Sequence, residues 1–254
     1  MHRPTFFSVP AVRRLARAAP VTLFAFALVL SVAASPARGA SAPTPAGTGA
    51  HGPALAAPHV PSANLTLFDN NSGDSGIGIV SQNFEEADFA IYDAEGADDF
   101  TVPAGHIWTV KEVVVTGVYF NGSGPADSEN VRFYTNQGSL PNQALKAYPG
   151  VVGADNGGSF DITLPTAVTF SGGPSGGSGR TYWMSVVANM SFNSGGEWGW
   201  ESSNNSAGFA DVWRNPGDGF GTGCTSFTSE TSCIPDGQGP SKMFALKGSD
   251  KVTT

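Results

Sequence analysis

The chain has 254 residues, of which 33 are glycine, 13% are charged and 11% are aromatic, and its formal net charge is −8. Beyond residue 60 it holds one histidine, His106, and two cysteines, Cys224 and Cys233, which leaves few groups for acid–base catalysis, thiolate chemistry or a zinc site. The acidic excess argues against nucleic acid or an anionic membrane as a partner, because both are bound largely through Lys and Arg.

Residues 1–40 are predicted to be a signal peptide. Four arginines and no acid precede an apolar run at Ala18–Ala34, and small residues follow it, as in secretory signals. The run is shorter than the roughly 20 residues of a spanning helix, which favours cleavage over the alternative, an uncleaved anchor. We therefore expect a secreted protein, extracellular or at the cell surface, with no membrane partner after cleavage. Eight basic and 21 acidic residues would remain, a net charge of −13.

Residues 41–63 are predicted to be a disordered linker. They contain no Asp, Glu, Lys or Arg, but five prolines and seven alanines. A segment of this composition has too few large apolar side chains to build a core. Residues 64–248 have the length of one domain, and residues 249–254 are predicted to be a disordered tail.

The domain at 64–248 reads as short apolar or alternating runs between turns rich in Gly, Asn, Asp and Ser. Alternation is clearest at Phe160, Ile162 and Leu164, which would share one face of a strand. With no amphipathic helix between the runs, we predict an all-β fold, a two-sheet antiparallel sandwich that is jelly-roll-like. The expected strands are Leu65–Phe68, Gly76–Val80, Asp99–Val102, Ile107–Phe120, Asn130–Thr135, Ala144–Tyr148, Ser159–Leu164, Ala167–Phe170, Thr181–Met190, Glu197–Glu201, Asp211–Arg214 and Met243–Lys247.

Two acidic stretches are candidate calcium sites, since calcium prefers hard oxygen ligands in loops. The candidate ligands are Asp69, Asn71, Asp74, Asp98 and Asp99. The first stretch fails the EF-hand pattern because Asp74 stands where that loop needs glycine. The alternative is a solvated acidic face, so calcium is expected only as a structural ion held by dispersed residues.

A pair of tryptophans is the candidate ligand-binding surface. Trp198 and Trp200 lie two residues apart, so on a strand they point to the same face about 6.7 Å apart. With Glu201 beside them they would form a flat aromatic surface for stacking on sugar rings. The alternative is that both rings lie in the core, where tryptophan is usually largely buried.

A Gly-rich loop at Asn215–Cys224 could add Asp218 and Phe220 to the rim of that ligand site, although a plain surface loop is the alternative. In an oxidising compartment Cys224 and Cys233 are expected to form a disulfide. Closing so short a loop stabilises the fold by roughly 2.5–3 kcal/mol in the chain-entropy model.

Several segments resemble an uncharacterised β-sandwich domain of exported bacterial proteins, which occurs alone or beside secreted subtilisin-like peptidases and surface-sorting signals. That group has no established activity or catalytic residues, so the resemblance implies a secreted accessory module. The segments that carry it are Ala97–Gly105, Ile107–Val110, Gly117–Gly122, Asn130–Tyr134, Trp198–Glu201 and Asn215–Cys224.

These observations favour a secreted, non-catalytic binding or adhesion module over an enzyme. The expected partner is an extracellular polysaccharide or cell-surface glycan, and we expect a monomer. The alternative is a secreted hydrolase whose carboxylates come together from different strands. Glu197 and Glu201 do not form such a pair, because four residues along a strand separate their Cα atoms by about 13 Å, beyond the roughly 5–9.5 Å between the carboxyls of glycosidases.

Overall fold

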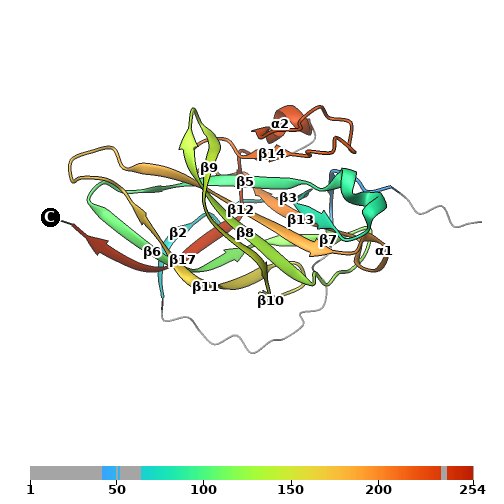
Figure 1. The fold of residues 1–254 in the computed structure, drawn as a ribbon, viewed down its shortest axis with the longest axis horizontal. Helices are drawn as coiled ribbons and strands as arrows, with labels where there is room; N and C mark the ends of the chain where they lie inside the picture. Colours follow the sequence, from blue (N-terminus) through green and yellow to red (C-terminus); the bar gives the residue numbers. More distant parts are fainter. Residues whose placement is uncertain (1–41, 50, 52–63, 236–238, 254) are drawn as a thin grey trace, which may run out of the picture. The chain divides into compact units, whose positions relative to one another are not determined.

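The computed structural model describes residues 42–49, 51, 64–235 and 239–253. These residues form sheets that are antiparallel except for the pairing of β4 (Gln82–Phe84) with β12 (Arg180–Met190), with only three short helical turns between them (Figure 1), which confirms the predicted all-β class. The predicted signal peptide and the rest of the predicted linker lie outside the described residues. Within the described part of the chain, no helix is both long enough and apolar enough to cross a membrane.

Hydrogen bonding divides the strands into three sheets. Sheet A contains β1 (Ala46–Gly47), β3 (Asp74–Val80), β7 (Gly117–Phe120), β13 (Glu197–Ser203) and β16 (Ser241–Lys242). Sheet B contains β2 (Leu65–Asp69), β6 (His106–Val115), β10 (Ala154–Asp155), β11 (Phe160–Ser171) and β17 (Phe244–Val252). Sheet C contains β4 (Gln82–Phe84), β5 (Glu95–Val102), β8 (Ser128–Gln137), β9 (Leu140–Val151), β12 (Arg180–Met190), β14 (Val212–Arg214) and β15 (Thr228–Ser229). The helical turns are η1 (Ala87–Tyr92), α1 (Phe192–Gly195) and α2 (Glu230–Cys233).

Sheets A and B are joined where the chain passes from one into the other. The predicted single strand Ile107–Phe120 is in fact β6 and β7, divided at Thr116. The Thr116 N–H donates to the carbonyl of Met243, which divides β16 from β17 in the same way. The Thr116 carbonyl accepts from the N–H of Glu201. Residues 113–120 are nearly all apolar, so no change in their pattern marks this crossing.

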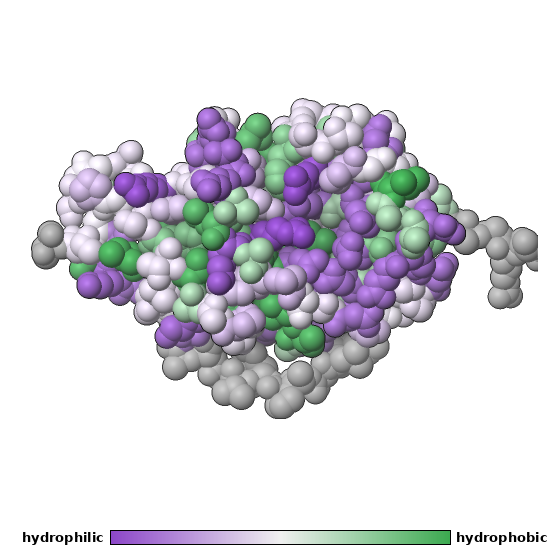
Figure 2. Space-filling model, viewed as in Figure 1, coloured by the Kyte–Doolittle hydropathy of each residue, from purple (hydrophilic) through white to green (hydrophobic). Residues whose placement is uncertain are grey.

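Strand β8 shows how alternation gives sheet C two different faces. Val131 and Phe133 are fully buried, whereas Asn130 and Arg132 point to the opposite face and remain partly exposed. Part of this outer face is polar, since Figure 2 shows hydrophilic groups over the middle of β8 and β12, and part is a small apolar cluster that includes Tyr134 and Trp183. The outer face of sheet C is therefore available for a binding site.

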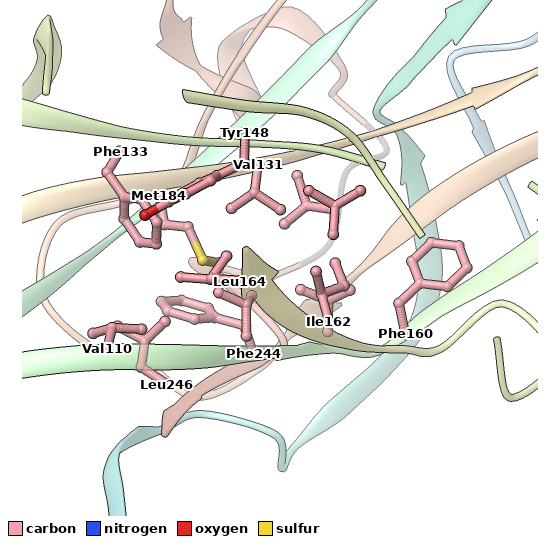
Figure 3. Packing of buried hydrophobic residues seen from close by; sticks show 14 of the residues in the cluster. Val110, Val131, Phe133, Tyr148, Phe160, Ile162, Leu164, Met184, Phe244 and Leu246 are labelled. Carbon is pink, nitrogen blue, oxygen red and sulfur yellow. The ribbon is translucent and has the colours of Figure 1, made fainter. Parts of the chain in front are cut away.

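The main core lies between sheet C and the joined sheets A and B. Phe160, Ile162 and Leu164 of β11 are all buried, as their alternation predicts, and they pack with Phe133 and Met184 of sheet C (Figure 3). Burying each such side chain contributes about 1.5–3 kcal/mol. This layer of aromatic and branched side chains holds the strands of sheet C in a fixed register.

Both predicted disordered segments next to the domain contain strands. β1, inside the predicted linker, pairs with β3, and an added Cβ at Gly47 would overlap the ring of Phe120. β17 continues to Val252, which pairs with His106 of β6, so the prediction of a disordered tail is wrong. Pairing with the edge of a sheet uses backbone groups, and a segment without large apolar side chains can therefore be ordered.

Glu129 makes the stability of the fold dependent on pH. Its side chain is buried on β8 and accepts a hydrogen bond from the N–H of Gly153 at 2.8 Å. Burial, with the charge of Asp155 nearby, raises its pKa from 4.5 to about 7. The folded state therefore holds this proton more tightly than the unfolded state, and the stabilisation present below pH 4.5 is lost as the pH rises to about 7.

We expect Glu129→Gln to flatten this part of the pH profile, because glutamine keeps an acceptor for Gly153 but does not titrate. Urea denaturation at intervals from pH 4.5 to 7.5 measures the difference. Asp218→Asn, at an exposed position, is the matched control. Identical profiles for the wild type and Glu129→Gln would contradict the assignment.

Candidate functional site

The two tryptophans proposed for sugar stacking are core residues. Trp198 and Trp200 are both 0% exposed. Their indole N–H groups donate to the carbonyls of Gly158 at 2.7 Å and Met243 at 2.8 Å. The expected aromatic surface is therefore wrong, and the alternative stated for these residues holds. The physical reason is that both rings point into the main core, where Trp198 packs against Phe160 and Trp200 against Phe244.

The other proposed ligand-binding residues do not share one surface. Glu201 is 3% exposed, and one of its carboxylate oxygens, Oε2, has no hydrogen-bond partner among the described residues. Asp218 is exposed in the loop after β14. Phe220 is partly buried and packs against Tyr92 and Trp213, with ring centroids 5.1 and 5.9 Å apart.

Each candidate calcium ligand accepts a hydrogen bond from another residue of the chain. Asp69 and Asp74 accept from the N–H groups two residues ahead, and Asn71 accepts from the Thr116 hydroxyl. Asp98 and Asp99 are fully buried and accept from backbone N–H groups. Within the described ranges, no group of three or more acidic, histidine or cysteine side chains could hold a metal ion. Calcium binding stays a prediction without a located site.

The predicted disulfide is confirmed. Cys224 and Cys233 are bonded and both are buried. The bond ties the loop that follows β14 to the short helix α2, and both cysteines lie in a core cluster with Trp213 and with Val80 of sheet A.

A polar hollow of about 280 Å³ lies on the outer face of sheet C, the face opposite the main core. Strands β4, β5, β8, β12 and β14 all contribute to its lining, so it is formed by the sheet itself and not by one loop. Its polar lining residues are Gln82, Asn83, Asp93, Glu95, Asn130, Arg132 and Arg214.

Glu95 is the centre of this hollow's polar network. Its side chain is 7% exposed and accepts from the hydroxyls of Tyr134 and Ser185, each at 2.6 Å. The same carboxylate pairs with Arg132 Nη1 at 3.2 Å and with Arg214 Nη2 at 2.5 Å. Burial acts to raise the pKa of Glu95, but the two arginines outweigh it and hold the pKa below its usual value.

The guanidinium groups of Arg132 and Arg214 are held in place by Glu95, but some of their N–H donors remain available. Each side chain is about one third exposed, and each guanidinium carries five N–H donors. Arg214 also lies over the ring of Phe227, 4.3 Å from its centroid. Both arginines therefore keep donors for a ligand in the hollow.

The remaining lining groups complete a set of donors and acceptors. The amides of Asn83 and Asn130 both donate to Asn189 Oδ1, at 3.1 and 2.7 Å, which fixes their orientation. Asp93 accepts from the N–H of Phe84 at 2.8 Å, and partial burial raises its pKa. Such an arrangement is suited to a ligand that offers hydroxyl groups and a negative charge.

Sequence reasoning did not identify this site. Glu95, Arg132 and Arg214 lie far apart along the chain, and no motif groups them. One signal was present: after Arg38 the chain contains just three arginines, and two of them converge here.

Comparison of the chain with protein-family models, with curated proteins and with solved structures finds no match.

Proposed function

We infer that the protein is a secreted, non-catalytic binding module whose polar hollow recognises an acidic sugar residue of an extracellular polysaccharide. The observation that carries this proposal is the pair of guanidinium groups, Arg132 and Arg214, held on one buried glutamate. A guanidinium binds a carboxylate through two parallel hydrogen bonds. The disulfide and the predicted signal peptide support export.

The size and lining of the hollow fit one sugar ring of a longer chain. Its volume of about 280 Å³ lies just below the range of roughly 300–1,000 Å³ typical of small-molecule sites. Asn83 and Asn130 would face ring hydroxyls, and the arginines would face the carboxylate. The chain's overall negative charge opposes the approach of a polyanion, so this recognition depends on the local arginines.

The contacts that the Glu95 carboxylate already makes favour a binding function over hydrolysis. A glycosidase needs one carboxyl that is free to act as nucleophile or base, whereas Glu95 already accepts hydrogen bonds from three side chains and forms an ion pair with a fourth, Arg132. One observation favours the alternative hydrolase: Asp93, in the same hollow, has the raised pKa that a general acid needs. Products released from a bound glycan would distinguish the two functions.

The test is calorimetric titration with oligosaccharides that contain uronic acid. We expect binding that weakens when the carboxylates are reduced to alcohols, and that weakens by about 10–100-fold in Arg132→Ala, because a charge-assisted hydrogen bond contributes about 1.5–3 kcal/mol. Arg180→Ala, an exposed arginine that does not line the hollow, is the control and should bind normally.

Absence of binding to every acidic oligosaccharide by the folded protein would overturn the proposal. Equal loss of affinity in Arg132→Ala and Arg180→Ala would also overturn it, since this would indicate only an effect of overall charge. New reducing ends in the titrated sample would show that the glycan is cleaved, and the hydrolase function would then replace the binding function.

A further inference from the structure

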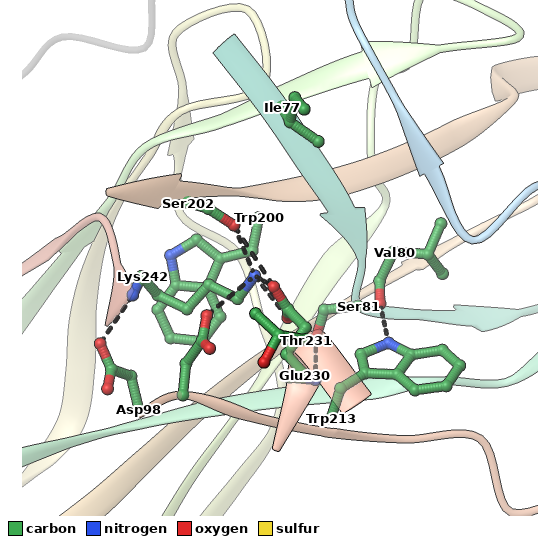
Figure 4. Close-up of polar contacts among 12 residues, drawn as sticks. Ile77, Val80, Ser81, Asp98, Trp200, Ser202, Trp213, Glu230, Thr231 and Lys242 are labelled. Carbon is green, nitrogen blue, oxygen red and sulfur yellow. Dashed lines mark hydrogen bonds and ion pairs between the residues drawn. The ribbon is translucent and has the colours of Figure 1, made fainter. Parts of the chain in front are cut away.

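A lysine is completely buried between sheets A and C. Lys242 on β16 is 0% exposed, and its ammonium Nζ lies 2.6 Å from Glu230 Oε2 and 3.5 Å from Asp211 Oδ2. Nζ also donates to the Ser202 hydroxyl at 3.0 Å. Figure 4 shows Lys242 and Glu230 meeting beneath Ser202. The side chains of Glu230 and Asp211 are 0% and 1% exposed.

This cluster is poorly stabilised as a set of charges. Both oxygens of Asp211 lack a hydrogen-bond partner among the described residues, although their burial calls for one. A third buried acid, Asp98, accepts from the backbone N–H of Lys242 at 2.7 Å. Two acids therefore contact one buried cation and a third lies against its backbone, and the desolvation of each charge is costly.

Protonation of the acids follows from the same burial. Burial and the nearby charge of Asp211 raise the pKa of Glu230, and burial also raises the pKa of Asp211. Both carboxyls contact the same ammonium, Glu230 at 2.6 Å and Asp211 at 3.5 Å. Glu230, which makes the shorter contact, is therefore placed to take a proton from the amine and pass it to Asp211.

We propose that Lys242 and Asp211 condense without another enzyme into a covalent amide that links the two side chains. One proton passes from the ammonium through Glu230 to the Asp211 carboxylate, which leaves a neutral amine and a neutral acid. The Nζ lone pair bonds to Cγ of Asp211, one C–O bond breaks, and that oxygen leaves as water with the second proton, which Glu230 carries from Nζ. Nζ keeps one hydrogen, Glu230 returns to its starting state, and no oxidant or reductant is needed.

The geometry points to Asp211, not Glu230, as the carboxyl that is attacked. Nζ lies 2.7 and 2.6 Å from the two oxygens of Glu230, so Glu230 holds the amine and is the group placed to receive its proton. A nucleophile must approach a carbonyl carbon from above the plane. Asp211 has only Oδ2 near Nζ and no donor that fixes its orientation, so it can turn its face toward the amine.

Two physical effects favour the reaction. The folded chain holds the amine and the acid together, and such pre-organisation can equal effective concentrations of roughly 10⁵–10⁸ M. Condensation also replaces a buried ammonium and a buried carboxylate with a neutral amide, which removes the cost of desolvating both charges. The new bond would close a loop from Asp211 to Lys242 that contains the Cys224–Cys233 disulfide, and it would link sheet C to sheet A.

The test is mass spectrometry of the purified full-length chain after reduction and denaturation. We expect a mass about 18 Da below that of the same sequence, the mass of one water. Trypsin should then release residues 181–214 joined to residues 215–247, because an acylated Lys242 is not cleaved. We expect Glu230→Gln to remain unlinked with its normal mass, since it lacks the proton carrier.

Lys247→Ala is the control, because Lys247 forms a partly exposed ion pair with Glu112 and should not affect the link. Cooperative thermal unfolding shows whether each sample is folded. A folded wild-type protein with unchanged mass, and with trypsin cleavage after Lys242, would overturn the proposal. A cross-link from Lys242 to Glu230 would overturn the assignment of Asp211.

Discussion

Glu95→Ala is expected to destabilise the fold by about 3–5 kcal/mol, because it leaves two buried hydroxyls without their acceptor, at about 1–3 kcal/mol each, and breaks two partly exposed ion pairs. The substitution leaves Arg132 and Arg214 without their anion, and it removes the acceptor of the Tyr134 and Ser185 hydroxyls. The guanidinium groups would then repel each other and leave their fixed positions. We therefore also expect loss of acidic-sugar binding. Urea denaturation and calorimetric titration measure the two effects.

Glu95→Gln is the matched comparison, because it keeps the shape of the side chain and one acceptor oxygen but removes the charge. Its destabilisation should be smaller than that of the alanine variant. Its affinity for the sugar should still fall, since the arginines lose their common partner. A Glu95→Ala protein as stable as the wild type would show that the network contributes no stability.

Trp200→Ala is expected to lower the free energy of unfolding by about 3–5 kcal/mol, as truncation of a large buried aromatic side chain usually does. The indole of Trp200 is fully buried, packs against Phe244 with ring centroids 6.0 Å apart, and donates to the carbonyl of Met243. That carbonyl lies at the crossing between sheets A and B. The variant should therefore weaken the joint between these sheets, as measured by urea denaturation.

Trp200→Phe separates packing from hydrogen bonding, because it restores most of the ring but not the indole N–H. Its cost should be well below that of Trp200→Ala. Binding of acidic sugars by the folded fraction should be unchanged in both variants, since Trp200 does not line the hollow. Loss of binding with little loss of stability would restore the exposed aromatic surface predicted from the sequence.

The all-β class could be predicted because it depends on local pattern. Alternation at Phe160, Ile162 and Leu164 fixes which side of β11 meets the core. The short spacing of Cys224 and Cys233 likewise sufficed for the disulfide. Both features involve residues close together in the chain, so neither requires knowledge of how distant strands pair.

The edges and crossings of the sheets could not be predicted in this way. β1 and the end of β17 are held by backbone pairing with distant strands, which their own side chains do not signal. The break at Thr116 lies in a continuous apolar run and depends on Met243, far along the chain. The burial of Trp198 and Trp200 follows from packing against Phe160 and Phe244, which lie on strands distant in the sequence.

The polar hollow depends most on tertiary structure. Arg214 faces Glu95 because β14 and β5 pair in that register, and Arg132 approaches because it pairs with Ser185 on the intervening β12. A shift of one residue in either pairing would turn a guanidinium toward the core. The order of residues thus specified strands, turns and a disulfide, all of which are local. Strand register, which depends on packing across the whole sandwich, decided which charges meet.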